Sequence, residues 1–200
     1  MRVLLREMLM FAAGLLLGEK ALAAQDVKET AQICAGCHGE KGVPVDKTTP
    51  IIRGQNEGYL YLQLRDFKSG VRKNDTMGPI AASLEKEDMK ALAAYFSGLK
   101  WTDLQQPSAP GDIASKAQTA IGSIGCTGCH LQQYQGDGST PRLAGQQHDY
   151  LQATMLAFRD RSRGNNPGMS DLMNAASPDD LAAIATYLAG LQIVGGTNGR

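Results

Sequence analysis

The sequence contains few residues of the kinds that hold transition metals, with four cysteines and three histidines among 200 residues. It also lacks a net charge, because 20 Lys and Arg balance 20 Asp and Glu. No basic field is present that would favour nucleic acid as a partner. No alternating apolar and polar stretch of useful length indicates a β-strand. These absences predict an all-α protein that does not bind nucleic acid.

Long apolar runs are absent as well. The most apolar stretch is residues 8–18, which follow Arg2 and Arg6 and precede Ala21-Leu22-Ala23, an A-x-A cleavage pattern. This arrangement predicts a cleaved signal peptide over residues 1–23 and export to the periplasm. A retained anchor with peripheral membrane association is the alternative, although a membrane span needs roughly 20 apolar residues. Cleavage would leave 17 basic and 18 acidic side chains.

All four cysteines and two of the three histidines belong to a pentad that occurs twice. C-x-x-C-H is the attachment signature of a c-type haem, in which both thiols form thioethers with the porphyrin and the histidine binds the iron. A disulfide, a zinc site or a thioredoxin-like redox pair would leave the histidine unexplained. The sequence therefore predicts two covalently bound haem c groups. The attachment residues are Cys34, Cys37, Cys126 and Cys129, and the axial ligands from the pentads are His38 and His130.

The two pentads head two copies of one repeating unit, since a shift of 91 or 92 positions superimposes landmarks of the two halves. The matched segments are the pentads, residues 50–55 with 141–146, Tyr59 with Tyr150, Phe67 with Phe158, Met77 with Met169, and Tyr95 with Tyr187. The shift changes by one residue only in loops, where insertions are tolerated. We expect an N-terminal domain over residues 24–104, a linker over 105–112 and a C-terminal domain over 113–200.

Each unit is predicted to be helical. A helix over residues 26–33 delivers the first pentad, Asn56 caps a second helix, and a last helix covers about residues 85–98. In the second unit, Ser177-Pro178-Asp179-Asp180 is a strong helix start, whereas Glu85 is a weaker cap at the matching position. Units of about 80–90 residues are small for an independent core, and a covalently held haem would supply much of the apolar interior.

The remaining axial position of each iron decides the chemistry. Met77 and Met169 are the candidates, because each lies 39 residues after the histidine of its pentad in a segment rich in Gly, Pro and Asn. Met173 is the alternative for the second haem, at about one helical turn from Met169. His148 is the only further histidine, so bis-histidine ligation at both irons is excluded. His/Met ligation closes the iron to other ligands and predicts electron transfer rather than catalysis.

Two further features leave alternatives open. Basic side chains precede the candidate methionines, and they either are solvated or pair with haem propionates. These side chains are Arg72, Lys73, Arg159, Arg161 and Arg163. Trp101 either packs between the two units or anchors the end of a helix.

Over about residues 25–193 the chain resembles the cytochrome c4 family. The resemblance rests on the two C-x-x-C-H motifs, the two P-x-x-x-G-Q segments, the Tyr-Leu starts of the second helices and the spacing from each methionine to the last helix. It implies an all-α tandem of two class I cytochrome c domains in a pseudo-twofold arrangement, with His/Met ligation at both irons.

The same resemblance implies a periplasmic, non-enzymatic electron carrier of a respiratory chain. The donor would be a quinol-cytochrome c reductase of the bc1 type, and the acceptor a haem-copper terminal oxidase. The alternative is a dihaem electron-accepting subunit of a periplasmic dehydrogenase, of the flavocytochrome type, which would need a sizeable exposed apolar patch. A catalytic dihaem enzyme would need an open iron, and the paired methionines argue against it.

Overall fold

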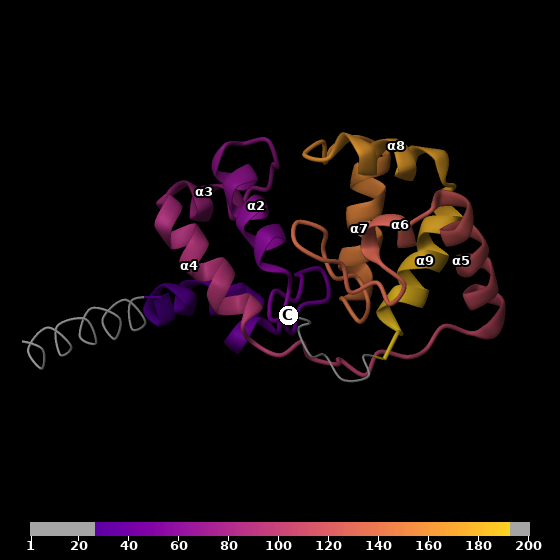
Figure 1. The fold of residues 1–200 in the computed structure, drawn as a ribbon, viewed down its shortest axis with the longest axis horizontal. Helices are drawn as coiled ribbons and strands as arrows, with labels where there is room; N and C mark the ends of the chain where they lie inside the picture. Colours follow the sequence, from indigo (N-terminus) through magenta and orange to yellow (C-terminus); the bar gives the residue numbers. More distant parts are fainter. Residues whose placement is uncertain (1–26, 193–200) are drawn as a thin grey trace, which may run out of the picture.

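The computed structural model describes residues 27–192. Within this range the chain is helical and contains no β-strand, which confirms the predicted class. Two groups of helices follow each other along the chain and are joined by an extended segment (Figure 1). The predicted signal peptide lies outside the described residues. None of the helices between residues 27 and 192 is long and apolar enough to cross a bilayer.

The N-terminal domain is built around a small core. Residues 27–38 are helical and are followed by η1 (Glu40–Gly42), α2 (Glu57–Lys68), α3 (Met77–Ala82) and α4 (Lys86–Ser97). Helix α2 packs against both α3 and α4. The large side chains buried between them are Leu60, Leu84, Met89, Leu92 and Phe96. Helix α4 begins where predicted, because the Asp88 carboxylate accepts a hydrogen bond from the backbone N of Glu85 at 2.8 Å.

The C-terminal domain has a larger core. It contains α5 (Gly111–Ile124), α6 (Thr127–His130), α7 (His148–Arg159), α8 (Pro167–Ala175) and α9 (Pro178–Ala189). Helix α9 packs against α5 and α7, and α8 packs against α7. The Ser177 hydroxyl accepts a hydrogen bond from the backbone N of Asp180 at 3.1 Å, which confirms the predicted start of α9. Helix α5 already begins at Gly111, within the predicted linker range 105–112.

The helix before each pentad behaves differently in the two domains. In the first domain the helix is longer than predicted and continues through the pentad to residue 38. In the second domain α5 ends at Ile124, because Gly125 adopts φ 81° and breaks the helix before α6 begins.

The predicted cap at Asn56 is wrong in its chemistry, although α2 does begin directly after it. The Asn56 side chain makes no hydrogen bond to its own helix. Its amide nitrogen instead donates to the carbonyl oxygens of Gln135 at 3.1 Å and Thr140 at 2.7 Å, both in the other domain. A tertiary contact between domains has replaced the local cap that the sequence suggested.

The contacts between the domains are reciprocal. The Gln146 side chain accepts from the backbone N of Ile51 at 2.8 Å and donates to its carbonyl at 2.9 Å. Likewise, the Gln55 side chain accepts from the backbone N of Arg142 at 2.7 Å and donates to its carbonyl at 2.9 Å. Gln55 matches Gln146 in the repeat, and Ile51 matches Arg142. Reciprocity of this kind is the mark of a twofold relation, so the domains have the predicted pseudo-twofold arrangement.

A second reciprocal pair brings α2 and α7 against loops of the opposite domain. The backbone N of Tyr59 donates to the carbonyl of Gly138 at 3.0 Å, and the backbone N of Tyr150 donates to that of Lys47 at 3.2 Å. Trp101 takes the interface role rather than serving only as a helix-end anchor, because the guanidinium carbon of Arg142 lies 5.4 Å from the centre of its ring.

Candidate haem sites

Both pentads face one cavity of about 1090 Å³ that spans the domain interface. Its lining includes the predicted cysteines, histidines and methionines of both domains, namely Cys34, Cys37, His38, Met77, Cys126, Cys129, His130 and Met169, together with Met173. Residues that are 39 positions apart in the sequence thus line the same cavity. The arrangement offers room for two large prosthetic groups in one continuous space.

The two pentad histidines are held in the same way. His38 and His130 are 8% and 6% exposed. The Nδ1 atom of each lies 3.0 Å from a proline carbonyl, that of Pro50 or Pro141. A carbonyl can only accept, so Nδ1 carries the proton and a neutral ring keeps its Nε2 lone pair free.

Burial supports this neutral form. Loss of solvation lowers the pKa of both histidines, and the hydrogen bonds to the proline carbonyls oppose this effect in part. A neutral imidazole with Nδ1–H bonded to a carbonyl is the form in which histidine binds a metal through Nε2.

None of the four cysteines forms a disulfide, and Cys34 and Cys126 are half-buried whereas Cys37 and Cys129 are exposed. Burial raises the pKa of the Cys34 and Cys126 thiols. No group of three or more His, Cys, Asp or Glu among residues 27–192 is placed to hold a metal ion, so the two pairs do not form a shared zinc site. Each pair remains beside its own histidine, as thioether attachment requires.

Met77 and Met169 share one backbone contact at the start of a helix. Met77 is the first residue of α3, and Met169 lies in the first turn of α8. Each backbone N donates to the side-chain oxygen of an asparagine three residues earlier, Asn74 at 2.8 Å and Asn166 at 3.1 Å. Both methionine side chains are half-buried at the cavity wall.

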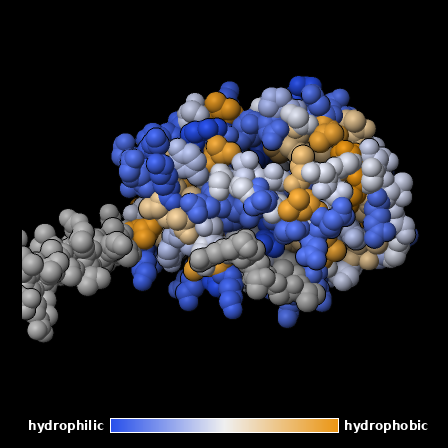
Figure 2. Space-filling model, in the orientation of Figure 1, coloured by the Kyte–Doolittle hydropathy of each residue, from blue (hydrophilic) through white to orange (hydrophobic). Residues whose placement is uncertain are grey.

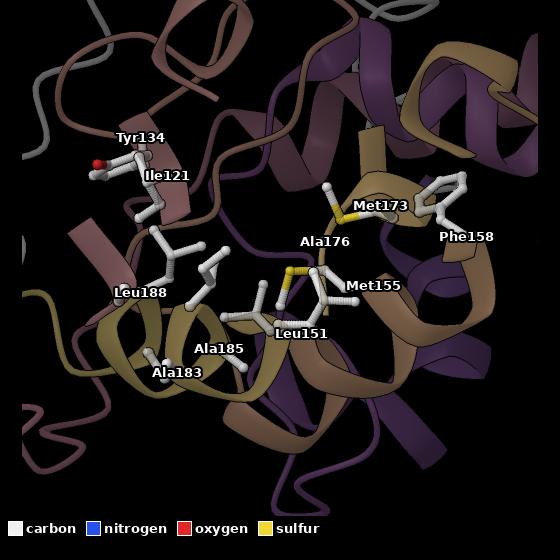
Figure 3. Close-up of a cluster of buried hydrophobic side chains, with 14 of the residues drawn as sticks. Ile121, Tyr134, Leu151, Met155, Phe158, Met173, Ala176, Ala183, Ala185 and Leu188 are labelled. Carbon is white, nitrogen blue, oxygen red and sulfur yellow. The ribbon is translucent and has the colours of Figure 1, made fainter. Parts of the chain in front are cut away.

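Met173 differs from this pair. It is only 3% exposed, one helical turn further along α8. Figure 3 shows it in a cluster of buried apolar side chains with Phe158, Met155 and Ala176. It also contributes to the cavity wall, but its packing is that of a core residue.

Two arginines of the predicted basic set reach across the domain interface. Arg72 and Arg163 occupy matching positions, and the guanidinium carbon of each lies 4.4 Å from the centre of a phenylalanine ring, Phe67 or Phe158. Both donate to the side-chain oxygen of Gln63, at 2.8 and 2.9 Å.

These arginines also cross the interface to tyrosines. Arg72 donates to the hydroxyl of Tyr150 and Arg163 to that of Tyr59, each at 3.3 Å. Of the other predicted basic residues, Lys73 lines the cavity. Arg159 donates to the carbonyl of Ala176 and Arg161 binds Asp171 instead.

The charges of Arg72 and Arg163 at the domain interface indicate whether haem fits the cavity. A buried guanidinium group is costly unless a negative charge compensates it, yet the hydrogen-bond partners of Arg163 are neutral oxygens. Burial alone would raise the pKa of Tyr150, but the charges of Arg72 and Arg163 lower it to about 7. The guanidinium groups of Arg72 and Arg163 are therefore suited to pair with anions, and the propionates of haem are carboxylates of the kind that arginine binds.

Sequence reasoning missed the role of several interface residues. Gln55 and Gln146 served only as landmarks of the repeat, and Tyr59, Tyr150 and Gln63 were assigned no function. The recurrence of P-x-x-x-G-Q in both halves was the available signal. It shows that the segment is retained, but not that its glutamine reaches into the other domain.

Comparison with known proteins agrees with this geometry. Residues 24–100 and 114–192 each match the cytochrome c family. The chain is 33% identical to cytochrome c4 of Azotobacter vinelandii over 181 residues, covering 80% of this chain and 85% of that one. It is 34% identical to the thiosulfate dehydrogenase electron acceptor of Stutzerimonas stutzeri over 183 residues, covering 86% and 85%.

A solved structure shows the same architecture. The crystal structure of reduced recombinant cytochrome c4 from Pseudomonas stutzeri matches with a TM-score of 0.75 at 27% identity, covering 84% of this chain and 98% of that one. The fold is thus a tandem of two class I cytochrome c domains, which carry two covalently bound haem c groups at the two cysteine pairs. The chain belongs to the cytochrome c4 family. It is a dihaem electron carrier like its cytochrome c4 relatives.

Proposed function

We propose that this chain carries single electrons in the periplasm from a bc1-type quinol-cytochrome c reductase to a haem-copper terminal oxidase. The observation that supports the proposal is the shared cavity, in which each pentad is accompanied by its own buried histidine and its own methionine. Two closed irons in one space can exchange electrons within the chain, and neither has a position left for a substrate. The protein acts as a carrier and not as an enzyme.

We infer that the axial ligands are His38 with Met77 and His130 with Met169. A bound haem c supplies an iron that alternates between the ferrous and ferric states by one electron. The chain orients each imidazole through its Nδ1–H, which leaves Nε2 for the metal. The thioether of each methionine takes the remaining axial position. The matching asparagine bonds at the two methionines support the choice of Met169 over Met173.

The domain ranges 24–104 and 113–200, the cleaved segment 1–23 and the periplasmic location belong to the same proposal. The two ranges follow the two family matches closely. Haem c is attached outside the cytoplasm in bacteria, which supports export. Fractionation tests this part: the holoprotein should appear in the periplasmic fraction with an N-terminus near Ala24. Recovery of the haem-bearing chain with residues 1–23 intact in the membrane fraction would support the anchor instead.

A second candidate function is that of electron acceptor for a periplasmic dehydrogenase. It is favoured by one relative, whose name is thiosulfate dehydrogenase electron acceptor. A tight, permanent complex would need an extended apolar patch. On the face shown in Figure 2, hydrophobic residues form separate small groups among hydrophilic ones. This surface supports a partner that binds transiently.

The decisive experiment compares electron transfer with purified partners. Stopped-flow absorption would follow reduction of the holoprotein by a bc1 complex and by a thiosulfate dehydrogenase, and its oxidation by a haem-copper oxidase. The respiratory proposal expects fast reduction by the bc1 complex and fast oxidation by the oxidase. Fast reduction by the dehydrogenase alone, or stoichiometric co-purification with it, would favour the second function.

The axial ligands have their own test. The oxidised protein should show the absorption band of Met-sulfur-to-iron ligation for two haems, and an alkaline pyridine spectrum should give two c-type haems per chain. Met77→Ala should remove half of the band. Retention of the full band would exclude Met77 as a ligand.

A further inference from the structure

One planar peptide unit links the first histidine to the other domain. The carbonyl oxygen of Pro50 lies 3.0 Å from Nδ1 of His38. The N–H of the same peptide unit belongs to Ile51 and donates to Oε1 of Gln146 at 2.8 Å. Because a peptide unit is planar, fixing the N–H of Ile51 also fixes the direction of the Pro50 carbonyl.

The second histidine is linked in the same way. The carbonyl of Pro141 lies 3.0 Å from Nδ1 of His130. The N–H of this unit belongs to Arg142 and donates to Oε1 of Gln55 at 2.7 Å. Each histidine is therefore connected, through one peptide unit, to a glutamine of the opposite domain.

The glutamines themselves are rigidly held. Gln55 and Gln146 are each 3% exposed. The side-chain oxygen of each also accepts from the N–H of the next residue of its own chain segment, at 2.9 Å, just before α2 or α7. The amide nitrogen of each donates at 2.9 Å to the carbonyl of the residue whose N–H bonds the side-chain oxygen, Arg142 for Gln55 and Ile51 for Gln146. A buried group with these bonds transmits the position of its own helix to the partner peptide.

We propose that Gln55 and Gln146 are positioning residues, each of which sets the orientation and basicity of the histidine ligand in the opposite domain. This inference rests on the axial ligation by His38 and His130 proposed above. Hydrogen bonds in a chain polarise one another, so the bond from Ile51 to Gln146 makes the Pro50 carbonyl a better acceptor. A stronger bond at Nδ1 makes the imidazole a more basic ligand, which favours the ferric iron.

Loss of either glutamine side chain should raise a reduction potential. Without the Gln146 side chain, the hydrogen bond at His38 weakens and the reduction potential of the N-terminal haem rises. Loss of the Gln55 side chain does the same for the C-terminal haem. Each variant acts mainly on the haem that lies in the other domain, and a residue that merely packed inside its own domain would not produce this crossed pattern.

The test uses Gln146→Leu and Gln55→Leu in the holoprotein, which keep the approximate side-chain size but remove both hydrogen bonds to the opposite domain and the one to the next residue. Gln147→Leu is the matched control. This variant also removes a buried hydrogen bond across the interface, from the Gln147 side chain to the carbonyl of Pro44 at 3.3 Å. The peptide unit of Pro44 is not one of the two whose carbonyl is hydrogen-bonded to a histidine. The potentials of the two haems are measured separately by NMR during redox titration. Amide hydrogen exchange is measured at Ile51 and Arg142.

In Gln146→Leu we expect the larger potential shift, and in the positive direction, at the N-terminal haem. Exchange at Ile51 should become about tenfold faster, which corresponds to one hydrogen bond of about 1.4 kcal/mol. Gln55→Leu should shift the C-terminal haem and accelerate exchange at Arg142. Gln147→Leu should leave the pattern of potentials as in the wild type.

Equal shifts of both haems, or the same shifts in Gln147→Leu, would overturn the proposal in favour of general loosening of the interface. If one of the two variants fails to yield holoprotein, the other still tests the proposal, because the same shift is then expected at the other haem. Fast wild-type exchange at Ile51 and Arg142 would overturn the proposal without any variant. Failure of the ligand assignment would be visible separately, as absent signals of iron-bound His38 or His130 in the wild-type NMR spectrum.

Discussion

Met169 and Met173 lie one helical turn apart on α8, and replacing each by alanine should have clearly different effects. Met173 is 3% exposed, and its neighbours Met155, Phe158 and Ala176 are also buried. Removing a fully buried methionine side chain leaves a cavity and costs about 2–5 kcal/mol. Met173→Ala should therefore lower the free energy of unfolding by this amount while leaving the iron ligands in place.

Met169→Ala should act on the iron. Its side chain is half-buried at the cavity wall in the position that matches Met77. The variant should lose half of the Met-to-iron absorption band of the oxidised protein, and the potential of the C-terminal haem should fall because the iron loses its thioether ligand. Absorption spectroscopy and denaturant unfolding of both variants provide the assay. Loss of half the band in Met173→Ala, with an intact band in Met169→Ala, would reverse the assignment.

Two further predictions concern the interface and the C-terminal helix. Gly58→Ala should destabilise the holoprotein, because a Cβ there would lie 2.8 Å from the carbonyl oxygen of Gly138 in the other domain. In contrast, Gly122→Ala in α5 meets no atom within 4 Å and should stabilise by about 0.5–1 kcal/mol. A more stable Gly58→Ala in denaturant unfolding would contradict this account of the interface. The Ser177 hydroxyl is the main cause that holds the pKa of Asp180 below its ordinary value. Asp180 therefore stabilises the fold above its unfolded pKa of about 3.9, and this contribution is lost as the pH falls through the lower folded value. The stability difference between wild type and Asp180→Asn should be constant from pH 7 to about 5 and should shrink in stronger acid, and growth of the difference on acidification would refute the assignment.

Local chemistry explains which structural predictions succeeded. The start of α9 follows from Ser177, Pro178 and Asp180, whose cap needs only neighbouring backbone groups. The cap at Asn56 failed because the competing acceptors, the carbonyls of Gln135 and Thr140, come from residues about 80 positions away. A short sequence window contains no sign of such partners.

At the candidate sites, too, local sequence patterns predicted some features, and contacts between distant residues set the others. The pentads follow from the sequence because attachment chemistry demands fixed residue types at fixed short spacings. The repeat spacing predicted Met77 and Met169 as their partners, and the structure places all of these residues around one cavity. The sequence alone did not decide whether Arg72 and Arg163 are solvated or pair with haem propionates. Their hydrogen bonds to Tyr150 and Tyr59 of the opposite domain depend on how the two repeats meet.

Residue patterns are enough to show that this protein has two haem-binding units of one kind, because covalent attachment and internal duplication both leave recognisable motifs. The shared cavity and the hydrogen bonds from Gln55 and Gln146 to the peptide units next to the other domain's histidine become visible only in the folded chain. A hydrogen bond between domains requires two surfaces to be brought together in a particular orientation. Packing of the whole chain sets that orientation, and no local pattern encodes it.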